Sequence, residues 1–102
     1  MTIARGRGAC EYMILELVMP GSTVLGRVIR RARRQSGISQ ESLAAAADID
    51  RTFMGEIERG TSNPSFEVLE RIAKGLGVKL SELMRVYESE AEKTVGTGHR
   101  VS

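Results

Sequence analysis

Four residues between positions 51 and 56 could contact the edges of DNA bases, three of them through their side chains and one as a glycine. Arginine can donate two parallel hydrogen bonds to guanine, threonine offers a hydroxyl and a methyl group, and glutamate can accept a hydrogen bond from cytosine. A glycine lets a bare backbone approach a groove wall or a neighbouring helix. The candidates for base contact are Arg51, Thr52, Gly55 and Glu56. Glu56 could accept a hydrogen bond from cytosine, but its negative charge could also repel phosphate, so a base contact by Glu56 stays open.

Apolar spacing predicts two short helices joined by a tight turn around these residues. The predicted inner faces are Leu43, Ala44 and Ala47 in the first helix and Phe53, Met54 and Ile57 in the second. Ser39 and Asp50 are suited to cap the two helix starts. Because the alanines are small, the helices can cross closely. This is the layout of a helix-turn-helix DNA reader, with Arg51, Thr52, Gly55 and Arg59 opposite the apolar stripe of the second helix.

A helix predicted over about 24–36 carries an arginine-rich outer face. Its expected inner stripe is Leu25, Val28, Ile29 and Ala32, and Arg27, Arg30, Arg31 and Arg34 point away from it. Those four arginines face either solvent or phosphate. Arg33 differs because it lies on the flank of the stripe, where a partly desolvated guanidinium needs a carboxylate. Glu58 is placed similarly on its own helix.

Two further helices complete a predicted all-α, five-helix domain. The fourth opens at Pro64 and Ser65, with either Asn63 or Ser65 as its cap, and ends at Gly77. Its expected inner stripe is Phe66, Leu69, Ile72, Ala73 and Leu76, and the fifth helix follows from Leu80, Leu83, Met84 and Tyr87.

From about Val24 to Leu83 the chain resembles the phage repressor and Cro-like helix-turn-helix family. The matching motifs, in family order, are Gly37-Ile38-Ser39-Gln40, Ile57-Glu58-Arg59-Gly60, Asn63-Pro64-Ser65 and Leu76-Gly77-Val78. One departure is Asp48, at a turn position that usually holds glycine, because aspartate tolerates a left-handed backbone less freely. The run Asp50-Arg51-Thr52-Phe53 is also similar to the recognition-helix start of restriction-modification controller proteins.

The resemblance implies roles for residues outside the base-contact set. Phosphate contacts are implied for Gln40, Arg59, Ser62 and Asn63. Such contacts would hold the protein in register without reading sequence. The resemblance also implies an internal ion pair between Arg33 and Glu58, expected to act as a structural clamp rather than as a DNA contact.

Composition agrees with a small regulatory module without cofactors. The 102 residues have a formal net charge of +2, which is too small to argue nucleic-acid binding by itself. The single cysteine, Cys10, excludes an intrachain disulfide, and no apolar run is long enough to span a bilayer, so we expect a cytoplasmic protein. No nucleophile with a paired base is evident, which argues against an enzyme. His99 has no companion ligand, so no metal site is expected.

The flanks of the predicted domain at 23–87 leave several readings open. Residues 1–22 form an N-terminal extension in which the apolar segment 12–19 is either a dimerisation strand or a helix packed on the bundle. Translation could also start at Met13 or Met19, which would make the first residues incidental. Residues 88–102 are expected to be a flexible tail.

The sequence predicts a transcriptional regulator, expected to be a homodimer that reads a palindromic operator in the major groove. Two copies are needed because one short helix reads only a few base pairs, and half-sites would lie about 34 Å apart. A repressor would cover a promoter, whereas an activator would need a surface for the polymerase. The alternative is an antitoxin or another protein-interaction module that docks a partner through residues 12–19.

Overall fold

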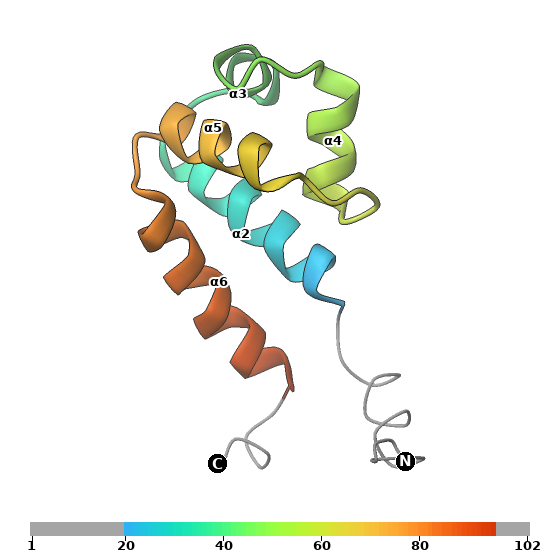
Figure 1. Cartoon of the computed structure of the whole chain (residues 1–102), viewed down its shortest axis with the longest axis vertical. Coiled ribbons are helices and arrows are strands. Elements are labelled where there is room, and N and C mark those ends of the chain that lie inside the picture. The colour runs from blue at the N-terminus through green and yellow to red at the C-terminus, as the bar shows by residue number, and fades with distance from the viewer. Residues whose placement is uncertain (1–19, 96–102) are drawn as a thin grey trace.

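The computed structural model describes residues 20–95, which form five α-helices. These are α2 (Gly21–Gln35), α3 (Gln40–Ala46), α4 (Arg51–Arg59), α5 (Phe66–Leu76) and α6 (Leu80–Val95). Figure 1 shows α3 and α4 at one end of the molecule, while α6 runs beside α2. The expected all-α class is confirmed, and the described residues contain no strand.

Several expectations concern residues outside the described range 20–95. They are the strand or helix at 12–19 with its proposed partner, the disulfide argument at Cys10 and the metal argument at His99. Within the described range, none of the helices combines the length and the apolar character that crossing a membrane requires.

Helix α2 begins at Gly21, three residues before the expected start. The Pro20 carbonyl accepts backbone hydrogen bonds from Thr23 at 3.0 Å and Val24 at 3.2 Å, which extends the helix toward the N-terminus. Val24 is therefore part of the core, with Val28 and Ile29. Of the expected inner stripe, Val28 and Ile29 are buried, whereas Leu25 and Ala32 pack against this core but are only half-buried.

Gly26 sets the distance at which α2 crosses α4. A Cβ atom at this position would collide with the backbone carbonyl oxygen of Ile57 and would lie 2.6 Å from that of Glu58. Only a glycine therefore allows α2 to lie directly against the α4 backbone. Sequence reasoning did not identify this position, because nothing in the local pattern of α2 indicates which residue meets α4.

The helix caps expected at Ser39 and Asp50 are both present, on either side of the turn that joins α3 to α4. The Ser39 hydroxyl accepts the backbone N–H of Ser42 at 3.0 Å, and the Asp50 carboxylate accepts that of Phe53 at 2.7 Å. Asp48 adopts the left-handed conformation, with φ at 59°. Ala44 and Ala47 are buried where α3 meets its neighbours, as their small size predicts.

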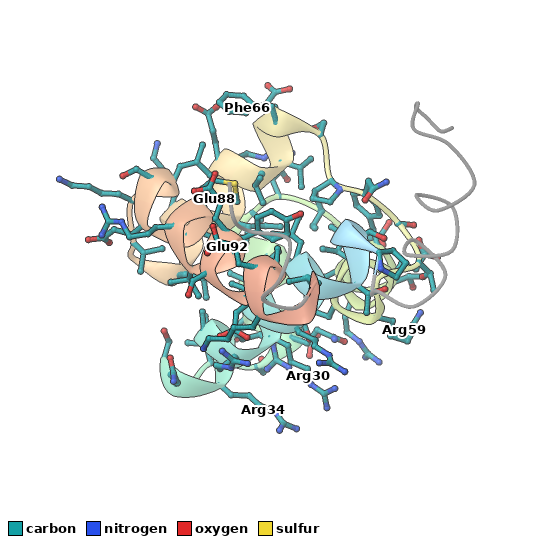
Figure 2. All side chains as sticks on the ribbon, turned by 90° about the horizontal axis from the view of Figure 1, so that it is seen from below. Arg30, Arg34, Arg59, Phe66, Glu88 and Glu92 are labelled. Atoms are coloured by element: carbon teal, nitrogen blue, oxygen red, sulfur yellow. The ribbon has the colours of Figure 1, made fainter. Side chains whose placement is uncertain are left out.

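Helix α5 packs as expected except at its first residue. Its cap is Ser65, whose hydroxyl accepts the backbone N–H of Val68 at 3.1 Å, so the alternative cap at Asn63 is excluded. The expectation that Phe66 is an inner residue was wrong, because it is 68% exposed. Figure 2 shows Phe66 at the edge of the molecule, where the helical period continues but no neighbouring element covers it.

Helix α6 continues to Val95, well past its expected end at Tyr87. The prediction of a flexible tail from residue 88 was therefore wrong over 88–95. Ala91 continues the apolar contact that Tyr87 makes with the core, and Glu90 pairs with Arg31 of α2 at 3.2 Å. These contacts with α2 stabilise turns whose own sequence is mostly polar.

Candidate nucleic-acid interface

The solvent-facing side of α4 begins with Arg51 and Thr52. Both side chains are exposed, whereas Met54 and Ile57 on the opposite side are fully buried. Among the described residues, Arg51 makes no hydrogen bond or ion pair. Its five donors are thus available to an external acceptor at the N-terminal end of the helix.

Gly55 is buried beneath the side chains of its neighbours rather than exposed beside Arg51 and Thr52. A Cβ atom here would lie 3.1 Å from Nη1 of Arg59 and 3.6 Å from Oε1 of Gln40. The absence of a side chain lets these two groups lie close to the α4 backbone. The surroundings of this glycine are therefore side chains of the protein, Arg59 of the same helix and Gln40 of α3, rather than open solvent.

Glu56 and Ser62 contact each other across the end of α4. The Ser62 hydroxyl donates to the Glu56 carboxylate at 2.9 Å. The backbone N–H of Thr61 also donates to the Glu56 carbonyl at 2.9 Å, and Gly60 turns the chain with φ at 81°. Glu56, an expected base contact, and Ser62, an expected phosphate contact, are thus hydrogen-bonded to each other, and their contact fixes the loop after α4.

The ion pair between Arg33 and Glu58 is present and is almost entirely enclosed. Nε and Nη2 of Arg33 donate to the two carboxylate oxygens at 2.7 and 3.2 Å, and the side chains are 12% and 3% exposed. Nη1 of Arg33 also donates to the carbonyl oxygen of Ile38 at 2.9 Å, and Gln40 donates its amide N–H to Glu58 at 3.1 Å. This network joins α2, the loop that follows it, α3 and α4.

A shallow hollow of about 300 Å³ lies over this network. It is lined by Arg30, Arg33, Gln40, Glu58 and Arg59. Because the Glu58 carboxylate is occupied by Arg33 and Gln40, the charges left at the rim are those of Arg30 and Arg59. Such a rim suits an anion with several oxygen atoms. Sequence reasoning expected Gln40 and Arg59 here but did not distinguish Arg30 from the other outer arginines of α2.

Asn63 lies apart from this hollow. It lines a separate depression with Gly21, Ser22 and Tyr87, near the start of α2. The structure thus groups the four expected phosphate contacts in three places: Gln40 with Arg59, Ser62 with Glu56, and Asn63 by the α2 N-terminus. Among the residues in 20–95, no cluster of metal-ligating side chains accompanies them.

Comparisons with known proteins find relatives that cover this part of the chain. The control protein C.MunI of Mycoplasma sp is 44% identical over 66 residues, covering 64% of this chain and 89% of that protein. The controller protein C.AhdI from Aeromonas hydrophila matches in structure with a TM-score of 0.59 at 34% identity, over 61% of this chain and 94% of that chain. The C.Esp1396I tetramer, in complex with its natural 35 base-pair operator, matches with a TM-score of 0.67 at 32% identity, over 72% of this chain and 96% of that chain.

The matched region runs from the middle of α2 to the start of α6 and contains most of the arrangement described above, although Gly21, Ser22 and Tyr87 lie outside it. The model of the family described as Helix-turn-helix matches residues 29–83. These residues include the capped turn, the outward face of α4 and the buried ion pair. The chain therefore belongs to the helix-turn-helix family.

Proposed function

We propose that this protein is a sequence-specific, DNA-binding transcription regulator that acts as a homodimer on a palindromic operator. The observation that carries the proposal is the outward face of α4, where Arg51 and Thr52 are exposed at the start of a helix. The opposite side of that helix is held by the core and by the Arg33–Glu58 pair. A reading helix needs this combination, because its side chains must reach base edges from a fixed backbone.

Arg51 is the principal base contact in this proposal. Its planar guanidinium would donate to O6 and N7 of one guanine, and Thr52 would contact a neighbouring base edge or a thymine methyl group. Glu56 and Gly55 are secondary candidates, because Glu56 already accepts from Ser62 and Gly55 lies beneath Arg59.

Backbone phosphates would be held by Gln40, Arg59, Ser62 and Asn63. Gln40 and Arg59 share the hollow over the ion pair, where two oxygens of one phosphate can be met by donors from α3 and α4. These contacts would set the register of α4 in the major groove. They contribute affinity without sequence preference.

The homodimer and the operator rest on general geometry and on the relatives. One helix of this length reads only a few base pairs, and a two-fold pair reads two half-sites about 34 Å apart. The controller protein C.Esp1396I forms a tetramer on its natural operator, which supports repeated copies of this domain on one duplex. In this proposal the protein is not an enzyme, and it acts in the cytoplasm.

Selection of bound sequences from a random duplex pool, at two salt concentrations, tests the proposal. We expect a palindrome whose enrichment persists at the higher salt, because phosphate affinity alone falls steeply with salt. Recovery of no sequence, with only salt-sensitive binding, would refute base reading.

Arg51→Ala assigns the base contact within the selected operator. We expect a loss of about 1–3 kcal/mol concentrated at one base position in each half-site. The control is Lys79→Ala, which removes an exposed cation from the turn before α6. Equal weakening on every sequence would instead make Arg51 a phosphate contact.

A further inference from the structure

Helix α2 carries five arginines and no acidic residue. Two of the five have carboxylate partners: Arg33 pairs with Glu58, and Arg31 pairs with Glu90 of α6. Arg27, Arg30 and Arg34, here called the arginine stripe, are exposed and have no acidic partner among the described residues. Of the four outer arginines expected to share one role, Arg31 is thus engaged within the protein and three are not.

A purely solvated helix face does not explain the arginine stripe. Solvated faces commonly mix acids and bases, because pairs of opposite charge three or four residues apart support the helix. The stripe has one sign only, so its members repel each other when no anion is present. Favourable interaction with the helix C-terminus accounts for Arg34, which lies in the last turn, but not for Arg27 or Arg30 in earlier turns.

The arginine stripe is continuous with the proposed phosphate surface. Arg30 lines two neighbouring hollows, one with Gln40 and Arg59 and the other with Arg27 and Arg34. Figure 2 shows Arg30, Arg34 and Arg59 on the same side of the molecule, opposite the exposed Phe66. A polyanion held at Gln40 and Arg59 would therefore meet Arg30 next, and then the rest of the stripe.

We propose that the arginine stripe binds backbone phosphates of the same DNA duplex, beside the phosphates held by Gln40 and Arg59. The stripe would extend the footprint of each protomer from α3 and α4 onto α2 without reading bases. This inference rests on the proposed function, because it takes the duplex docked through α4 as the source of the phosphates. The ligand is the sugar–phosphate backbone, which guanidinium groups recognise through paired hydrogen bonds and charge.

The dependence of DNA affinity on salt tests the stripe directly. For the full-length double variant R30Q/R34Q on the selected operator, we expect the slope of log K against log salt to become shallower by about 1.8, since each lost contact on duplex DNA removes about 0.9. The order of preference among operator variants should stay unchanged. A matched control is K79Q/R85Q, which removes two exposed positive charges from the α6 side of the molecule.

A slope for R30Q/R34Q equal to that of K79Q/R85Q would overturn the proposal. Phosphate ethylation interference gives a second measurement: wild-type protein should be blocked by ethylation at flanking phosphates that no longer matter to R30Q/R34Q. Identical interference patterns in the two proteins would also count against the stripe. If wild-type protein selects no sequence at all, the proposed function is refuted. If wild-type protein binds selectively but R30Q/R34Q leaves the slope unchanged, only the proposal for the arginine stripe is refuted.

Discussion

Removing one partner of the Arg33–Glu58 pair should destabilise the protein more than removing both. The pair is nearly inaccessible to water, with side chains 12% and 3% exposed, and both carboxylate oxygens accept from Arg33 at 2.7 and 3.2 Å. A single substitution leaves one enclosed charge without its partner. Breaking a buried pair in this way costs about 3–5 kcal/mol.

The two single variants should differ in a defined order. In R33M the Glu58 carboxylate, the more buried group, keeps only the Gln40 amide as a donor. In E58M the guanidinium keeps the Ile38 carbonyl as an acceptor and lies closer to solvent. We therefore expect R33M near the upper end of the range of about 3–5 kcal/mol and E58M near the lower end.

The double variant R33M/E58M removes both charges and replaces them with side chains that can pack. The remaining losses are two hydrogen bonds, one to the Ile38 carbonyl and one from the Gln40 amide. At about 1 kcal/mol for each, the double variant should lose no more than about 2 kcal/mol. That is less than the expected loss in either single variant.

Urea unfolding of wild-type protein and the three variants, followed by the helical signal in circular dichroism, measures these differences in the free energy of unfolding. A single variant that is already unfolded can be compared in a stabilising osmolyte, with wild-type protein in the same buffer. The reasoning is refuted if the loss in R33M/E58M equals the sum of the losses in the two single variants, because additivity would mean that the charges do not interact.

Three further predictions concern single positions in the fold. Gly26→Ala should lose about 1–3 kcal/mol in urea unfolding despite the better helix propensity of alanine, because its Cβ would lie 2.6 Å from the Glu58 carbonyl oxygen; wild-type stability would contradict the close crossing. Asp48→Gly should gain up to about 1 kcal/mol by thermal unfolding, since glycine adopts the left-handed turn freely, and a loss would show that the aspartate side chain is needed. A hydrogen bond from Arg31 lowers the pKa of Glu90, so the ionised carboxylate stabilises the fold above its ordinary pKa, and this contribution is lost as pH falls through the lowered pKa. In R31Q, NMR titration of the carboxyl group should show the pKa of Glu90 rise toward its ordinary value. An unchanged pKa would exclude the Arg31–Glu90 pair in solution.

The local structure of this protein is predictable from its sequence because the relevant interactions lie within one helical turn. Ser39 and Asp50 each cap a backbone N–H three residues later. The left-handed turn at Asp48 was expected from the family resemblance, which places a glycine there. The outward position of Arg51 and Thr52 follows from the apolar period of the same helix. The Arg33–Glu58 pair could be predicted only from the family resemblance, because its partners are 25 positions apart in the sequence.

Tertiary structure decided the features that depend on where one helix meets another. Phe66 is exposed because no neighbouring element covers the first turn of α5, although its spacing fits the inner stripe. Helix α6 extends past Tyr87 because Glu90 and Ala91 find partners on α2 and in the core. The same packing assigns Arg31 to Glu90 and leaves Arg30 beside Arg59.

The sequence by itself thus determined the presence of five helices, the caps at Ser39 and Asp50, and the outward position of Arg51 and Thr52. The crossings between helices determined at which position only a glycine fits, which arginines are paired and which surface is continuously basic. The physical reason is range: capping and periodicity act through backbone hydrogen bonds three or four residues apart, whereas the environment of an outer side chain is set by residues distant in the chain.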